Sequence, residues 1–288
     1  MSSVVLPSPA KLNLFLHITG QRADGYHSLQ TLFQLLDYGD SLTFSVNHSG
    51  DICLSPSIEG LAPEDNLIVR AARLLQSASG CTQGCDIAID KQIPMGAGLG
   101  GGSSNAATAL VGLNQLWQAG LSTDQLADLG AELGADVPVF VRGNTAFAEG
   151  IGELLTAVDI AEQWYLVITP NVQVSTAEIF SNPQLTRDTS PIKIRALSEV
   201  QYRNDCQAVV EKLYPAVNQA LEWMADYRNP LMTGTGASVF CSFDNQTEAQ
   251  QALDLVPEQW SAFIARGDSR SSLHRQLGKI FTGASPSG

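Results

Sequence analysis

The segment from Ile93 to Ala109 places five glycines within seven positions, at Gly96, Gly98, Gly100, Gly101 and Gly102. Glycine tolerates positive φ and carries no Cβ that would keep an anion away from the backbone N–H groups. A Ser-Ser-Asn sequence follows and favours a helix start, whose free N–H groups and positive dipole end also suit phosphate oxygens. The segment therefore predicts a phosphate-binding loop and helix start made of Pro94, Met95, Gly96, Ala97, Gly98, Leu99, Gly100, Gly101, Gly102, Ser103 and Ser104.

A flexible linker is the alternative interpretation of this glycine-rich segment, but its flanks are apolar. An alternating strand pattern precedes it over residues 85–90, and helical apolar spacing follows from Ala106 to Trp117. The segment lacks the Gly-Lys-Ser/Thr of a Walker A loop. Residues 91–94 also separate the strand from the glycines, unlike in a dinucleotide-binding fingerprint. The pattern indicates another class of phosphate-binding loop.

Three other segments carry groups that could act on a bound phosphate. Asp136 is an acid among apolar residues after a helix that we expect to end at Gly134, although such an acid is more often a helix cap or turn residue. Lys11 is the single charge in the strand from Ala10 to Phe15, although such lysines are usually surface residues. The run from Thr233 to Ser238 is a second turn of small residues.

The elements that must position these groups alternate between strands and helices, which predicts an α+β or α/β fold. The expected strands cover residues 11–18, 31–36, 41–46, 85–89, 145–149, 164–170, 238–243 and 263–265. The expected helices begin near Asn66, after the glycines, after the Ser122-x-x-Gln125 capping box, and near residues 206, 216 and 248. We place a domain boundary after the strand at 145–149, giving domains 1–158 and 159–288.

Composition limits the function classes. The 288 residues carry a formal net charge of −13 with a pI near 4.6, which argues against a general nucleic-acid binder. The five cysteines are scattered; Cys81 and Cys85 could form half of a zinc site, but no second pair has matching spacing. No signal peptide or membrane-spanning run occurs in the sequence. We expect a cytoplasmic protein that acts on a small molecule, without nucleic-acid or membrane partners, and with its oligomeric state open.

Three motifs together resemble those of the GHMP kinases, which phosphorylate small-molecule alcohols with ATP. They are the segments 9–13, 94–107 and 231–237, in that order along the chain. Within this superfamily, the segments 11–14, 22–27 and 133–138 are similar to those of the family that phosphorylates the 2-hydroxyl of 4-diphosphocytidyl-2-C-methyl-D-erythritol in the non-mevalonate isoprenoid pathway. The resemblance extends from Pro7 to about Arg275.

The resemblance implies an α+β fold with an N-terminal domain like domain 2 of ribosomal protein S5 and a ferredoxin-like C-terminal domain, with the site between them. It implies that ATP and Mg²⁺ bind at the glycine loop, that Asp136 orients or deprotonates the acceptor alcohol, and that Lys11 stabilises negative charge at the acceptor oxygen or the γ-phosphate. Ser104 is the candidate Mg²⁺ ligand, although helix capping accounts for it equally well.

For the cytidine end, the resemblance implies that Tyr26 and Phe180 stack on the base and that His27 hydrogen-bonds to it. Ordinary helix packing is the alternative for Phe180. Substrate contacts are also implied for Asn13, Thr176, Gly234, Thr235 and Gly236. Two other hypotheses stay open: a related kinase acting on homoserine, mevalonate or a sugar, and a non-catalytic nucleotide- or RNA-binding module.

Overall fold

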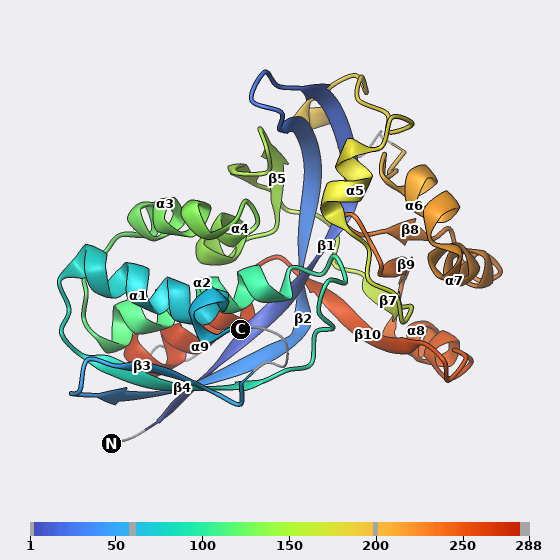
Figure 1. Ribbon diagram of the computed structural model, residues 1–288. Coiled ribbons are helices and arrows are strands. Elements are labelled where there is room, and N and C mark those ends of the chain that lie inside the picture. Colours follow the sequence, from blue (N-terminus) through green and yellow to red (C-terminus); the bar gives the residue numbers. More distant parts are fainter. Residues whose placement is uncertain (1–2, 58–61, 198–200, 283–288) are drawn as a thin grey trace.

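The computed structural model describes residues 3–57, 62–197 and 201–282, and Figure 1 shows how its elements are arranged. The strands are β1 (Val4–Gln21), β2 (His27–Asn47), β3 (Ile52–Ser55), β4 (Gly84–Asp90), β5 (Ala146–Glu149), β6 (Leu154–Ala157), β7 (Trp164–Thr169), β8 (Leu231–Met232), β9 (Val239–Phe243) and β10 (Ser261–Asp268). The helices are α1 (Leu67–Ser79), α2 (Gly101–Leu116), α3 (Thr123–Leu133), α4 (Val137–Arg142), α5 (Thr176–Ser181), α6 (Gln207–Leu213), α7 (Pro215–Ala225), α8 (Gln246–Leu253) and α9 (Ser272–Leu277). No helix in these described ranges is both long and apolar enough to span a bilayer.

The strands form one mixed sheet in the order β3-β4-β2-β10-β7-β9-β8. Beside this path, β1 and β5 pair with β2, and β6 pairs with β5. The β3–β4 pair is parallel, whereas the other ladders between these strands are antiparallel. Helices α1 to α4 lie beside the half of the sheet that contains β3 and β4, and α6 to α8 lie beside the half that contains β7 and β9 (Figure 1). The predicted α+β class is confirmed.

The long β1–β2 ribbon crosses the molecule from one half to the other (Figure 1). Its register shifts between Pro9 and Lys11 and again between Asn13 and Leu16. Such irregularities bend strands and change where side chains point, and residues two apart on a strand share a face. The ribbon thus holds Lys11 and Asn13 on one face, between two irregularities.

The strands predicted at 31–36 and 41–46 are both parts of β2, and the polar residues between them do not turn the chain back. Asp40 lies in this polar stretch, and its side chain is buried. Its Oδ1 accepts hydrogen bonds from the backbone N–H groups of Gln92 (2.7 Å) and Ile93 (2.8 Å), and its Oδ2 pairs with Lys91 Nζ at 2.8 Å. This carboxylate therefore fixes the chain just before the glycine loop.

Helix starts were predicted most accurately where local capping determines them. The side chain of Asn66 caps α1 by accepting from Ile68 N, and Ser122 and Gln125 form the predicted capping box of α3. The later predicted helices correspond to α6, α7 and α8 with small shifts at their ends. Strands β3, β6 and β8 and helices α4 and α9 were not predicted.

Three groups of buried apolar side chains hold the fold together. One packs α1 to α4 against β2 and β4, a second packs α6 to α8 against β7 and β9, and a third lies between them, with members such as Leu12, Phe15, Tyr165 and Phe240. The last helix, α9, returns to the first group through Leu273 and Leu277. The division at residues 158 and 159 stays a prediction.

Candidate active site

The glycine loop connects β4 to α2 and turns through three left-handed residues. Gly96, Gly98 and Gly100 have φ of 66°, 74° and 71°. Gly101 and Gly102 were predicted to share this conformation, but they already form the first turn of α2, because Ser104 N donates to Gly100 O at 2.8 Å. The helix thus begins two residues before the predicted Ser-Ser-Asn start, with Gly100 as its N-cap.

The backbone N–H groups of this loop are available to a ligand. Within the described part of the chain, no protein acceptor hydrogen-bonds to the N–H groups of residues 98–103. Four of these residues, 100–103, are the N-cap and the first residues of the 16-residue helix α2, where the helix dipole adds a partial positive charge. An anion that accepts from these groups would satisfy donors that the fold leaves free.

A turn from the C-terminal half of the chain packs against the glycine loop. The Thr233 hydroxyl contacts Gly98 O at 3.2 Å, and Ser238 N donates to Ala97 O at 3.1 Å. A Cβ at Gly98 would lie only 2.3 Å from Thr233 O, so this position requires glycine for close packing as well as for its φ. The two small-residue turns that the sequence singled out are therefore in contact.

Lys11 lies between the glycine loop and the acid singled out in the sequence. Its side chain is 3% exposed, and its ammonium group contacts Asn13 Oδ1 at 2.5 Å, Gly98 O at 3.0 Å and Asp136 Oδ2 at 3.3 Å. Its backbone N–H also donates to Leu99 O at 3.0 Å. Lys11 is therefore not the surface lysine that its strand position alone would suggest, because its ammonium group is buried and bonded within the protein.

The Asn13 amide is itself held in one orientation. Its Nδ2 donates to Thr31 Oγ1 at 2.9 Å, and the Thr31 hydroxyl donates to Phe15 O at 2.5 Å. Asn13 Oδ1 is thereby left to accept from Lys11. These hydrogen bonds form a positioning network that runs from Phe15 through Thr31 and Asn13 to Lys11. Nothing in the sequence pattern had indicated a role for Thr31.

Asp136 precedes α4 but does not cap it. It occupies the N-cap position with φ of −84° and ψ of −12°, and its side chain accepts no hydrogen bond from the helix. The carboxylate is 34% exposed and its protein partner is the Lys11 ammonium group. The capping alternative raised by the sequence is thus not what the structure shows, and one oxygen of the carboxylate is open to a ligand.

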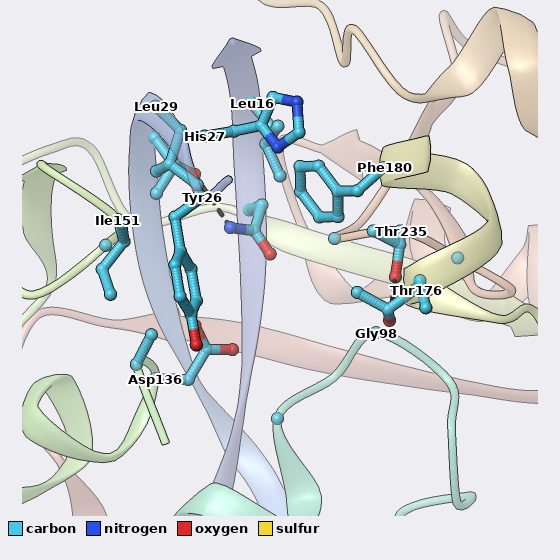
Figure 2. Close-up of a pocket in the computed structure, with 18 of the residues that line it drawn as sticks. Leu16, Tyr26, His27, Leu29, Gly98, Asp136, Ile151, Thr176, Phe180 and Thr235 are labelled. Carbon is cyan, nitrogen blue, oxygen red and sulfur yellow. Dashed lines mark hydrogen bonds between the residues drawn. The ribbon is translucent and has the colours of Figure 1, made fainter. Parts of the chain in front are cut away.

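One cavity of about 990 Å³ joins these groups to the aromatic residues, and Figure 2 shows part of its lining. The singled-out residues that line it are Lys11, Asn13, Tyr26, His27, Gly96, Gly98, Gly100, Asp136, Thr176, Phe180, Gly234, Thr235 and Gly236. The remaining predicted loop residues, Pro94, Met95, Ala97, Leu99, Gly101, Gly102, Ser103 and Ser104, do not line this cavity. Ala97 and Leu99 are buried, and their carbonyl groups accept hydrogen bonds from other backbone N–H groups. Met95, in contrast, is 58% exposed.

Ser104, the predicted Mg²⁺ ligand, lies inside the protein. Its side chain is fully buried, and its hydroxyl contacts the Ser8 hydroxyl on β1 at 3.0 Å. The residue follows the helix start by a full turn, so its side chain lies on the face of α2 that packs against β1. We therefore correct the assignment: Ser104 links α2 to β1 and does not face the cavity.

Asp136 is instead the carboxylate that the cavity offers beside the glycine loop. Mg²⁺ usually keeps several waters and binds one or two carboxylates together with substrate phosphates. A single carboxylate oxygen next to free loop N–H groups fits a Mg²⁺ ion carried mainly by a nucleotide. No cluster of three or more His, Cys, Asp or Glu side chains that could hold a metal occurs in residues 3–57, 62–197 and 201–282, and Cys81 and Cys85 are free thiols.

Aromatic side chains form the other end of the cavity. Tyr26 follows the turn between β1 and β2 and is 62% exposed, and Phe180 lies on α5. In Figure 2 the Tyr26 and Phe180 rings stand on opposite sides of the opening, with His27 next to Phe180. The His27 and Phe180 ring centroids are 5.1 Å apart at an angle of 32°. An exposed tyrosine across an opening from a second aromatic ring suits a flat ligand.

His27 is held by a residue that the sequence did not single out. Arg187 Nε donates to His27 Nε2 at 3.0 Å. Burial lowers the pKa of His27, and the positive charge of Arg187 lowers it further. Thr176 and Thr235 complete this end, with their hydroxyls 2.8 Å apart.

Comparisons with known proteins show the family to which this chain belongs. Models of the N-terminal and C-terminal domains of GHMP kinases match residues 66–144 and 186–262. The chain is 58% identical to the 4-diphosphocytidyl-2-C-methyl-D-erythritol kinase of Pseudomonas syringae pv. syringae (strain B728a), over 95% of this chain and 97% of that protein. It is also 58% identical to the enzyme of that name from Pseudomonas paraeruginosa (strain DSM 24068 / PA7), over 94% and 96% of the two chains. The chain belongs to the 4-diphosphocytidyl-2-C-methyl-D-erythritol kinase family.

Solved structures support the family and the fold. The crystal structure of a 4-(cytidine 5'-diphospho)-2C-methyl-D-erythritol kinase superposes with a TM-score of 0.80 at 30% identity, covering 92% of this chain and all of that one. The mevalonate kinase of Methanococcus jannaschii has a TM-score of 0.69 at 16% identity, covering 93% and 99%, which shows a shared GHMP kinase fold. The predicted kinase activity and two-part GHMP fold are thus confirmed.

Proposed function

We propose that this kinase transfers the γ-phosphoryl group of ATP to the 2-hydroxyl of 4-diphosphocytidyl-2-C-methyl-D-erythritol. The observation that carries this proposal is the position of Lys11. Its ammonium group contacts both Gly98 of the glycine loop and Asp136. It therefore lies where a phosphate bound at the loop and an alcohol bound at the aromatic end would meet.

The glycine loop and the aromatic end of the cavity each suit one of the two substrates. The free N–H groups of residues 98–103 suit the triphosphate of ATP, because phosphate oxygens are strong acceptors and helix N-termini favour negative charge. The Tyr26 and Phe180 rings suit a pyrimidine base, because stacking on aromatic faces tolerates a flat heterocycle. The cavity volume of about 990 Å³ accommodates both partners' reacting ends.

In the proposed reaction Asp136 accepts the proton of the acceptor hydroxyl, the freed oxygen bonds to the γ-phosphorus, and the bond to the β-phosphate oxygen breaks to release ADP. Lys11 holds the Asp136 carboxylate in place and stabilises the negative charge that is transferred. Phosphoryl transfer depends mostly on positioning and charge stabilisation. The positioning network through Asn13 and Thr31 fulfils the first need by keeping the ammonium group in one place.

When bound, Mg²⁺ would be held mainly by the nucleotide phosphates beside the glycine loop and would neutralise part of their charge, which leaves the open oxygen of Asp136 for the acceptor hydroxyl. On the substrate side, Thr176, Thr235 and the backbone of Gly234 and Gly236 line the part of the cavity between the aromatic rings and the glycine loop. We assign them to the polyol and diphosphate of the substrate.

Location in the cytoplasm stays a prediction.

The decisive experiment is an ADP-release assay with four acceptors offered separately: 4-diphosphocytidyl-2-C-methyl-D-erythritol, mevalonate, homoserine and galactose. We expect turnover with the first and a kcat/KM lower by at least about three orders of magnitude with the others, because a site with buried polar partners for one substrate rejects analogues that lack them. Equal turnover of mevalonate or homoserine would contradict the substrate assignment while leaving the kinase family intact.

A further inference from the structure

We propose that Arg187 is a positioning residue that determines the preference for cytidine over uridine by holding His27 in one tautomer. This inference rests on the proposed cytidine site. It adds a residue outside the cavity lining to the specificity of the reaction.

The contacts of Arg187 tie together two segments that are far apart in the sequence. Its Nε–H donates to His27 Nε2 at 3.0 Å, and its two terminal nitrogens donate to backbone carbonyls around the end of α5. Those acceptors are Phe180 O at 2.8 Å, Asn182 O at 2.9 Å and Leu185 O at 3.1 Å. One planar guanidinium group therefore fixes His27 at the start of β2 and the backbone that carries the Phe180 ring.

This geometry determines where the proton of His27 lies. A neutral imidazole has one N–H donor and one acceptor nitrogen, and arginine keeps its charge and only donates. Because Nε2 accepts from Arg187, the proton must be on Nδ1. The neutral form of the His27 ring is also favoured over the protonated form, because burial and the Arg187 charge both lower its pKa.

The Nδ1–H group is available to a ligand. His27 lines the cavity, and in the described residues no protein acceptor bonds to its Nδ1. The ring lies 5.1 Å from the Phe180 ring, on which we place the base. A fixed N–H donor beside a stacked pyrimidine pairs with the N3 acceptor of cytosine, whereas N3 of uracil carries a hydrogen and would face it with a second donor. Leaving this donor unpaired once the base covers it is costly.

The test compares Arg187→Lys with the parent enzyme in two measurements. Lysine keeps the positive charge but lacks the planar fork that reaches His27 and the α5 carbonyls together. The first measurement is the ¹⁵N spectrum of the histidine rings in the full chain; the four histidines are assigned by single substitutions. We expect a protonated Nδ1 for His27 in the parent and a mixture of tautomers in the variant. A His27 ring protonated on Nε2 in the parent would overturn the proposal.

The second measurement is the calorimetric affinity for CDP and for UDP. We expect the parent to prefer CDP and Arg187→Lys to lose about tenfold or more of that preference, while the affinity for ATP stays unchanged. An unchanged CDP-to-UDP ratio in a variant whose His27 tautomer has shifted would overturn the proposal. Arg203→Lys is the matched control, because the Nε of Arg203 donates to the Asp205 carboxylate and not to a ring, and it should change neither measurement.

A second substitution keeps the proposal testable if Arg187→Lys proves unstable. His27→Asn places an amide N–H near the position of Nδ1 without needing a tautomer. We expect His27→Asn to retain part of the CDP preference, and His27→Gln, whose amide lies near Nε2, to lose it. The opposite order would overturn the proposal. A parent enzyme that binds neither CDP nor UDP would refute the proposed cytidine site itself, which the ring spectrum distinguishes from a failure of the Arg187–His27 contact.

Discussion

The Lys11 ammonium group lies 3.3 Å from Asp136 Oδ2, although Lys11 is in β1 and Asp136 immediately precedes α4. The same ammonium group touches the carbonyl of Gly98 in the glycine loop. One ammonium group therefore connects the proposed base, Asp136, to the glycine loop that we propose binds the phosphates.

Asp136→Asn should lower kcat by about 10² or more, because an amide cannot accept the hydroxyl proton. Thermal unfolding should change only modestly, since the side chain makes no capping bond to α4 and the amide oxygen can still accept from the Lys11 ammonium group. Asp124→Asn is the control, an exposed carboxylate paired with Arg142, and it should keep full turnover. Steady-state kinetics and thermal melts on both variants check this. Near-full kcat in Asp136→Asn would remove Asp136 from the reaction.

Lys11→Met should also lower kcat by about 10² or more, because methionine fills similar space without a charge on the transferred group. The affinity for ADP should fall less than kcat, since the loop N–H groups remain. Single-turnover rates together with ADP titrations separate the two effects. If kcat were retained while nucleotide binding was lost, Lys11 would be a binding residue for the nucleotide and not a stabiliser of the transferred charge.

Gly96→Ala should raise the KM for ATP without the steric clash that other loop substitutions cause. Gly96 has φ of 66° and open space around a new Cβ, so alanine costs about 1–2 kcal/mol of backbone strain. Gly80→Ala is a matched control, because Gly80 has φ of 68°, is equally open, and ends α1 away from the cavity. Both variants should lose similar stability in urea unfolding, and the Gly96 variant alone should change the KM for ATP. Equal ATP kinetics in both would refute the loop assignment.

Tyr26→Ala and Phe180→Ala should each weaken CDP binding by roughly one to two orders of magnitude, as expected for about 1–3 kcal/mol of base stacking. The ATP affinity should stay the same because the glycine loop is a separate part of the cavity. Tyr26→Ala should leave stability nearly unchanged, since the ring is 62% exposed. Calorimetric titration measures both ligands. CDP binding as tight as the parent's in both variants would place the base elsewhere.

His17→Leu should make stability less dependent on pH below about 6.5. His17 is buried beside Phe15 with both ring nitrogens unpartnered, and burial lowers its pKa, opposed by nearby Asp205 and assisted by Arg203. The unfolded chain therefore binds the proton more readily, so the parent loses stability as pH falls from 6.5 toward the folded pKa of His17. Urea unfolding at about pH 7.5 and about pH 5.5 should show a smaller loss in the variant. Identical losses would contradict the prediction.

Much of the fold followed from the sequence because local chemistry determines it. The Asn66 cap, the Ser122 capping box and the alternating strand at residues 85–90 all depend on neighbouring residues. The start of α2 was wrong because Gly101 and Gly102 look like loop residues, yet the contacts of Ser104 with Gly100 and Ser8 make them helical.

The same distinction applies to the candidate site. Residue types and a family resemblance were enough to single out Lys11, Asp136 and Tyr26. They could not reveal Thr31, Thr233 or Arg187, whose contacts lie with segments distant in sequence and leave no local pattern. They also could not show that the Ser104 hydroxyl faces β1, because that depends on how α2 packs.

The return of α9 to the N-terminal core has a consequence for how the chain is made. Leu273 and Leu277 fill part of the apolar group that α1 to α4 build on the sheet, and β10 pairs with β2 just before them. During synthesis the first half of the chain emerges long before the residues that complete its core. That half must wait with uncovered apolar surface until the last helix arrives, so a late truncation should impair the folding of the earliest segments.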